Sequence, residues 1–263
     1  MNSLYLAVRA LECLLGISLL IQTLEFLRLQ AVQAPGGLWA WAVQRGDVAH
    51  ASAPIRWLLD TLYRPDLHRA HLLVRLAAAA SLLWGSSLAS ALLLFASTLL
   101  VLIRWRGAFN GGSDFMSIAV LTGLLAAHLA TPWIGAVLAW KAGLWYITIH
   151  AITSYFISGA IKLVTREWRN GSALVYFLDG GLYGPLASNS RFRRPAVARA
   201  CAWAFIVWEC LFPFALAGPR IAAVFCVVAA CFHYLVFRFF GLNRFFWAWL
   251  ASFPAIIYCA SQW

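Results

Sequence analysis

One apolar segment of the chain carries four polar side chains at intervals of four residues: His150, Ser154, Ser158 and Lys162. On an α-helix this spacing places them in a single, slightly slanting stripe. Ionisable groups inside a bilayer are costly, so each is a candidate functional residue. An amine partly removed from water gives up its proton readily, which suits Lys162 to act as a base. The structural alternative is hydrogen bonding between helices, with Lys162 extending to the membrane interface.

Two further ionisable residues occur in apolar surroundings in the C-terminal half. Glu209 lies in Trp208-Glu209-Cys210, and His233 precedes Tyr234. A carboxylate and an imidazole that join the Lys162 amine from separate helices would give one cavity three groups able to exchange protons. The alternative is a fixed pair between Glu209 and a histidine or arginine that sets the register of two helices.

A polar connection includes Asn110-Gly111-Gly112-Ser113-Asp114. The Asn-Gly-Gly sequence is typical of a turn with positive φ angles. Asp114 is placed to cap the helix that follows. The alternative is a loop that dips towards a substrate cavity, with Asn110 and Asp114 contributing to binding.

Composition indicates the kind of protein that positions these residues. Of 263 residues, 63% are hydrophobic and only 11% are charged. Soluble domains contain about 25% charged residues, and disordered chains are poor in aromatic residues. Aromatic residues reach 15% here. These values predict a polytopic integral membrane protein of the all-α class.

A membrane-spanning helix needs about 20 largely apolar residues. Runs of this kind predict one domain, residues 1–263, with about eight transmembrane helices. Gly85-Ser86-Ser87 is expected to form the turn between the second and third. The long connections 30–69 and 164–194 are expected to be polar or interfacial, with a helix on the membrane surface near residues 55–59. The eight runs are roughly 4–29, 70–84, 88–104, 114–130, 136–163, 195–216, 219–238 and 242–260.

The net charge of +11 has an uneven distribution. Most arginines flank the odd-numbered connections, whereas the opposite side has only Arg9, Arg75, Lys141 and Arg220. The positive-inside rule therefore predicts cytoplasmic odd-numbered connections and both termini outside. Dispersed arginines at membrane ends favour lipid headgroups as partners and argue against nucleic acid.

Motifs for nucleotide, zinc or haem binding and for serine hydrolases do not occur in the sequence, and no metal site is predicted. The six cysteines form no CxxC pair and are expected to be small apolar residues within the helices.

Several of these positions together resemble a known family. The segment Tyr155-x-x-x-Gly159-x-x-Lys162-Leu163, followed by Trp168 and Gly171, is similar to a pattern of HTTM proteins, whose membrane domain is shared with the vitamin K-dependent gamma-carboxylases. Three further places agree in order and spacing across nearly the whole chain: residues 110–116, Glu209 with Phe212-Pro213, and His233 before Gly241-Leu242-Asn243-Arg244.

The resemblance implies a bundle of membrane helices around a cavity, with a reduced, vitamin K-like quinone as cofactor. It gives Lys162 the role of the base that deprotonates the quinol, with His233 and Glu209 as catalytic companions. Substrate or cofactor binding would then involve a set drawn from several segments: Asn110, Asp114, His150, Ser154, Tyr155, Ser158 and Trp168.

Three departures separate this chain from the carboxylases. It ends at Trp263 without their large lumenal region, it has Asp114 and no histidine in the 111–114 loop, and the expected topology puts Lys162 near the cytoplasmic face. In size it is closer to short bacterial SdpB-like proteins, which implies a multi-pass protein of the bacterial inner membrane. Two functions remain open: a carboxylase-like enzyme that modifies a peptide or lipid-soluble substrate, and a non-catalytic subunit that holds a quinone, lipid or partner membrane protein.

Overall fold

The computed structural model describes residues 3–105 and 111–262, and every regular element in these ranges is a helix. Five helices are long and apolar enough to cross a membrane: α1 (Ser3–Arg28), α6 (Leu88–Trp105), α7 (Gly111–Ile134), α8 (Ala136–Val164) and α12 (Pro219–Phe240). The all-helical class is confirmed, and these helices support an integral membrane protein.

The other three expected spans coincide with helices that are shorter or broken. The run 70–84 lies mostly within α5 (Pro65–Ser81), which has 17 residues. The run 195–216 divides into α11 (Pro195–Cys210) and the 3₁₀ helix η3 (Phe212–Ala217), and 242–260 divides into α13 (Asn243–Leu250) and α14 (Phe253–Ala260). Proline stands in the first turn of both η3 and α14. Proline cannot donate to the preceding turn, so each chain segment bends there.

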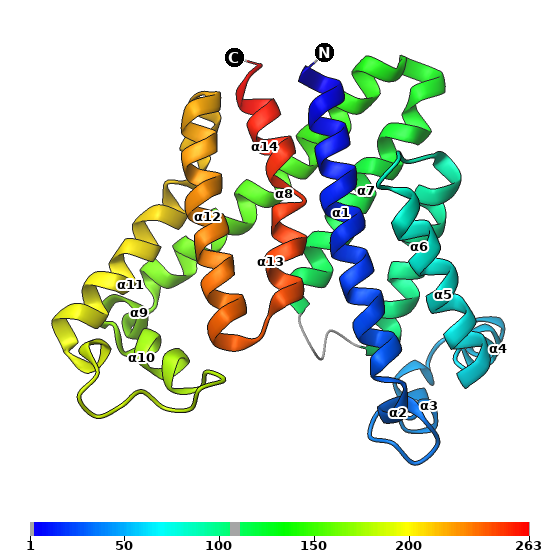
Figure 1. Cartoon of the computed structure of the whole chain (residues 1–263), viewed down its shortest axis with the longest axis horizontal. Coiled ribbons are helices and arrows are strands. Elements are labelled where there is room, and N and C mark those ends of the chain that lie inside the picture. Colours follow the sequence, from blue (N-terminus) through cyan, green and yellow to red (C-terminus); the bar gives the residue numbers. More distant parts are fainter. Residues whose placement is uncertain (1–2, 106–110, 263) are drawn as a thin grey trace.

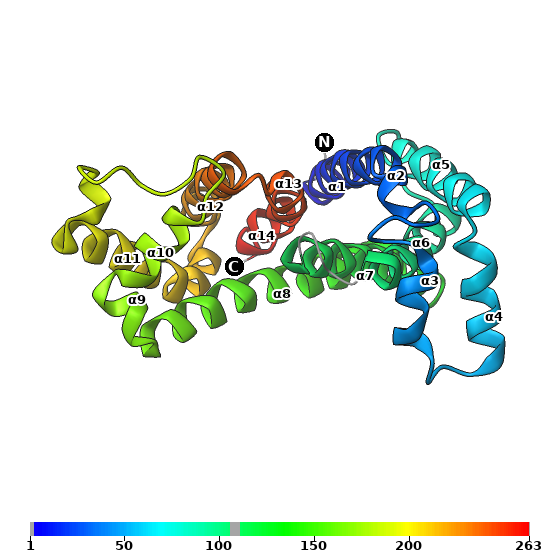
Figure 2. The same ribbon diagram turned by 90° about the horizontal axis from the view of Figure 1, so that it is seen from below.

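The helices form two groups that α8 joins. In Figure 1, α1, α5 and α6 run alongside one another, and α8 slants behind them towards α11. Figure 2 shows α8 reaching from α7 to α9 (Arg166–Asn170), while α13 and α14 lie between the two groups. Both termini lie at one end of the molecule. The opposite end holds α10 (Ser172–Asp179) and the short elements of the first connection: α2 (Gln30–Gln33), α3 (Trp41–Gln44), η1 (Arg45–Val48) and α4 (Ala53–Leu62).

The crossing of α8 and α11 depends on a glycine. A Cβ atom placed on Gly159 would lie 2.7 Å from the backbone nitrogen of Cys210 and 2.8 Å from the Cβ of Glu209. A side chain at position 159 would therefore push the two helices apart. Gly159 therefore permits the α11 backbone to approach α8 closely.

A helix is present near residues 55–59, where one was expected: α4 leaves Trp57 69% exposed. Its Asp60 accepts hydrogen bonds from the Arg45 guanidinium and from the indole of Trp41. These contacts join α4 to the preceding segment. α5 and α6 are joined by residues 82–87, but the turn lies at residues 82–84, before the predicted 85–87, which are irregular.

Candidate functional site

Lys162 and Glu209 form an ion pair where α8 crosses α11. The Lys162 Nζ atom lies 2.6 Å from Oε2 of Glu209 and 2.9 Å from Oε1. The two side chains are only 14% and 3% exposed. Gly159, one turn before Lys162, brings the α11 backbone close enough for this contact. Two of the three groups expected to share a cavity, the amine and the carboxylate, thus meet at this crossing.

The Lys162 ammonium has two further partners. Its Nζ donates to the hydroxyl of Ser158 at 2.5 Å, and that hydroxyl in turn donates to Oε1 of Glu209 at 3.3 Å. The ammonium also lies 5.2 Å from the ring centre of Trp168 on α9, which is a cation–π contact. Trp168, selected from the sequence as a binding residue, therefore contacts the lysine itself.

The polar stripe of α8 leads to this pair along an open groove of about 570 Å³. His150, Ser154 and Ser158 line the groove together with Thr153, and its apolar walls come from Ile149, Ile157 and Ile161. His150 and Ser154 bond locally, to the backbone oxygens of Tyr146 and His150. Among the described residues that line the groove, Ser158 is the one with hydrogen bonds to the ion pair.

His233 occupies a neighbouring aromatic cluster. Its Nε2 lies 2.6 Å from the hydroxyl of Tyr155, and both residues are at most 3% exposed. The imidazole stacks on Trp249 at 5.0 Å, and Tyr155 stacks on Phe212 at 3.9 Å. Among the hydrogen bonds of the described residues, none joins His233 to Lys162 or Glu209. Lys162 and Glu209 therefore form one pair, and His233 lies apart from them. The helix α8 supplies a partner to both, Lys162 to Glu209 and Tyr155 to His233.

Asp114 belongs to a third polar cluster, in which the capping prediction is wrong. It lies within the first turn of α7, which begins three residues earlier, and it accepts a hydrogen bond of 2.8 Å from Gln22. Arg244 lies 3.9 Å from Asp114 and 3.1 Å from Glu25, so the cluster links α1, α7 and α13. Asn110, the other predicted binding residue of this segment, lies outside the described residues.

We compared the chain with family models, with curated proteins and with solved structures. No match was found in any of the three. The resemblance to HTTM proteins thus stays a prediction. Within the described residues, His, Cys, Asp and Glu form no group of three that could hold a metal ion.

Sequence reasoning missed the arginine at the centre of the third cluster. The charge count places Arg75 at a membrane flank, yet its side chain extends from α5 and is fully buried against α1 and α6. It donates to Gln22 at 2.7 Å and to Thr98 at 2.8 Å, and further to Thr23 and Ser97. The signal was available, because Arg75 has Val74 and Leu76 beside it and Gln22 lies in an apolar run. Two polar residues in separate apolar segments are candidates for a pair.

Proposed function

We propose that this chain is an integral membrane enzyme that modifies a peptide or a lipid-soluble substrate, with Lys162 as its base. The observation that carries the proposal is the position of Ser158. Ser158 lines the α8 groove, and its hydroxyl contacts both Lys162 and Glu209. A molecule that enters the groove from the lipid thus meets a continuous polar path to a half-buried amine.

Glu209 gives Lys162 a route to the neutral form. At a separation of 2.6 Å, proton transfer from Nζ to Oε2 converts the ion pair into an amine and a carboxylic acid. No net charge is created in the apolar surroundings. The amine can then accept a proton from an acidic hydroxyl group at the end of the groove, and Glu209 retains the proton it received. Ser158 is placed to orient that hydroxyl group. Ser154 and His150 lie about 12 and 18 Å from Lys162 along α8, so they would contact more distant parts of the bound molecule.

The groove residues suit a reduced quinone, the cofactor that the family resemblance implies. Isoleucine side chains offer apolar walls for a ring and its tail, and three hydroxyl groups and an imidazole offer partners for its oxygens. When bound, a quinol would supply the acidic hydroxyl and, after reaction with oxygen, a base strong enough to deprotonate a substrate carbon. Lys162 and Ser158 would hold its reacting oxygen.

The full arrangement that we propose has eight membrane crossings. α5, α11 with η3, and α13 with α14 would supply the three beyond the five long helices. An even number agrees with the two termini lying at the same end. The basic connections would face the cytoplasm, and the location would be a bacterial inner membrane.

The test is mass spectrometry of peptides encoded beside this gene, co-expressed with the wild type or with Lys162→Ala. We expect a mass change that requires Lys162, with a loss of at least about a hundredfold in the variant, as for removal of a general base. The added mass names the chemistry, and one CO₂ would mean carboxylation. Lys141→Ala is the matched control, because Lys141 is the other lysine of the chain and lies on the same helix. Full activity of a correctly inserted Lys162→Ala would refute the proposal.

A non-catalytic membrane subunit is the second candidate, and the engagement of Lys162 favours it. The Lys162 ammonium already has three partners: Ser158, Glu209 and Trp168. This is what a contact that only holds helices together requires. This function predicts stable co-purification with partner membrane proteins. It also predicts that Lys162→Ala leaves the assembled complex functional. Purification of the chain alone as a homogeneous monomer would count against it.

A further inference from the structure

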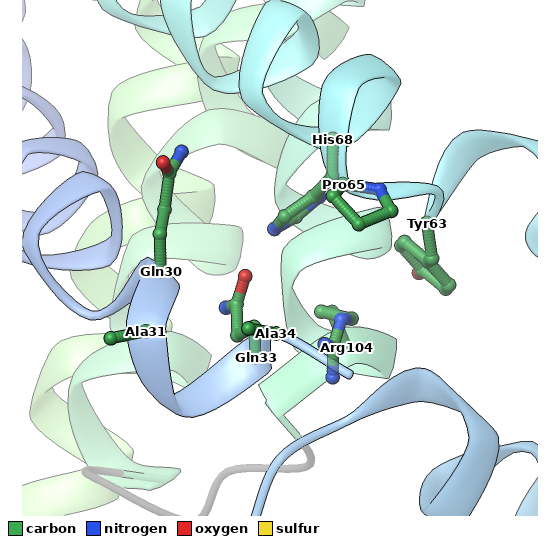
Figure 3. Close-up of a pocket in the computed structure, with 8 residues that line it drawn as sticks. All are labelled: Gln30, Ala31, Gln33, Ala34, Tyr63, Pro65, His68 and Arg104. Atoms are coloured by element: carbon green, nitrogen blue, oxygen red, sulfur yellow. The ribbon is translucent and has the colours of Figure 1, made fainter. Parts of the chain in front are cut away.

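A second cavity, of about 300 Å³, lies at the basic end of the molecule, away from the α8 groove. It is enclosed by α2, by the junction of α4 with α5, and by the end of α6. Figure 3 shows the His68 ring extending towards Gln33, with Arg104 beside them. The polar and aromatic residues that line it are Gln30, Gln33, Tyr63, His68 and Arg104.

Several buried polar atoms around this cavity have no hydrogen-bond partner in the described part of the chain. They are Nε of Arg104, Nε2 of Gln33 and both ring nitrogens of His68. Arg104 is 1% exposed and His68 is 3% exposed. Buried polar groups in proteins nearly always have partners. Four such atoms on three residues around one cavity indicate a polar ligand.

The charge of Arg104 indicates what kind of ligand this is. Its Nη2 donates to the backbone oxygen of Trp39 at 2.6 Å, and its Nη1 donates to Gln44. These contacts fix the guanidinium group and leave Nε for another acceptor. Within residues 3–105 and 111–262, which the structure describes, no carboxylate forms an ion pair with Arg104. The cavity thus combines an uncompensated positive charge with N–H donors from Gln33 and His68.

We infer that this cavity binds a phosphate group, held by Nε of Arg104, the amide of Gln33 and the ring of His68. Arginine N–H groups match phosphate oxygens in geometry and charge. The two sources of such a group are the headgroup of an anionic lipid and free phosphate. A lipid source suits the position of the cavity, beside the interfacial helix α4 and at the end of the molecule where arginines gather. This site is independent of the function proposed for Lys162.

The experiment measures binding to the detergent-solubilised full chain. Native mass spectrometry would follow dioctanoyl phosphatidic acid, with dioctanoylglycerol as the matched lipid that lacks phosphate. Inorganic phosphate would be titrated separately, with tryptophan fluorescence as the readout. The variants are Arg104→Gln and Gln33→Ala, and the control is Arg64→Gln, which removes an exposed arginine beside Tyr63. If Arg104→Gln fails to fold, Gln33→Ala still tests the site. Gln33 takes no part in the hydrogen bonds that hold Arg104 in place, so its loss should leave the fold intact.

We expect phosphatidic acid to bind and dioctanoylglycerol not to bind. Arg104→Gln should weaken binding by roughly tenfold to a hundredfold, the effect of losing one charge-assisted hydrogen bond. Gln33→Ala should weaken it by about threefold to tenfold. Binding of phosphatidic acid alone assigns the site to a lipid headgroup, and binding of inorganic phosphate assigns it to the free anion. The inference is overturned if neither binds, if Arg104→Gln and Gln33→Ala both bind normally, or if Arg64→Gln loses as much affinity as they do.

Discussion

At the scale of single residues, the contact between Lys162 and Glu209 offsets the free-energy cost of burying either charge alone. A lone charge inside an apolar bundle is strongly unfavourable, whereas an ion pair with good geometry recovers most of that cost. Lys162 contacts both carboxylate oxygens, and Ser158 supplements the pair. The same contact that permits burial therefore also allows a proton to move.

Glu209→Gln should destabilise the protein strongly, by about 3–5 kcal/mol, because it leaves the ammonium of Lys162 buried without its counter-charge. Thermal unfolding in detergent would measure the effect. Glu167→Gln, which neutralises an exposed carboxylate on α9, is the matched control and should change stability by less than about 0.5 kcal/mol. The double variant Lys162→Met with Glu209→Leu should recover most of the loss. A Glu209→Gln protein as stable as the wild type would contradict this account of the pair.

The residues of this site were only partly predictable from the sequence. Four-residue spacing on one helix identified the stripe that ends at Lys162, because helical periodicity is a local property. The partner Glu209 lies 47 residues away on another helix, and the exposure of both side chains depends on how α8 and α11 cross. The hydrogen bond between Tyr155 and His233 depends on packing in the same way, so sequence reasoning selected both residues without pairing them.

At the scale of elements, close approach of helices and breaks within them determine the site. Long apolar runs predicted the bounds of α1, α6 and α8 closely, since length and apolarity are read directly from the sequence. The break between α13 and α14 was missed, because a proline in the first turn of a helix also fits an unbroken apolar run. The inward placement of Arg75 was missed because the arginines were counted as membrane flanks, whereas Arg75 lies in the interior of α5 and finds its partners on other helices.

Gly159→Ala should separate α8 from α11 and cost about 1–3 kcal/mol of stability, as overpacking of a tight contact does. The added methyl group would lie 2.7 Å from a backbone nitrogen, which cannot move without its helix. Gly46→Ala is the control, because a Cβ at that position meets no atom within 4 Å. Thermal unfolding of both variants gives the comparison. Equal stability of the two would show that α8 and α11 adjust without cost.

The short elements of the first connection should loosen in acid. Hydrogen bonds from the Arg45 guanidinium and from the Trp41 indole hold the pKa of Asp60 below its usual value. Because the folded pKa is lower than the unfolded value of about 3.9, the stabilisation is present above that value and is lost as the pH falls through the folded pKa. Hydrogen exchange of α4, corrected for intrinsic rates, should show a modest loss of protection at acid pH, since an exposed ion pair contributes little. Asp60→Asn should lower the hydrogen-exchange protection of α4 at neutral pH and remove its dependence on pH.

At the scale of the whole molecule, charge and topology agree. The connections flanked by arginines, which include α2–α4 and α10, gather at one end, and both termini lie at the other. Burial of Arg75 removes one positive charge from the side expected to face outward, so the asymmetry is greater than the sequence count indicated. The α8 groove and the Arg104 cavity lie on different helices, so lipid contact at one need not exclude a substrate at the other.

Cysteine labelling of cells with a membrane-impermeant thiol reagent tests the orientation of the whole bundle. In a background without the native cysteines, Ser87→Cys places a thiol at an exposed position in the connection between α5 and α6, and Asn189→Cys places one in the exposed connection after α10. The positive-inside rule predicts that Ser87→Cys reacts in intact cells, whereas Asn189→Cys reacts only after the membrane is permeabilised. The reverse result would put Lys162 and Arg104 on the outer side of the membrane. Reaction of both thiols in intact cells would mean that the segments between them do not cross the bilayer as proposed.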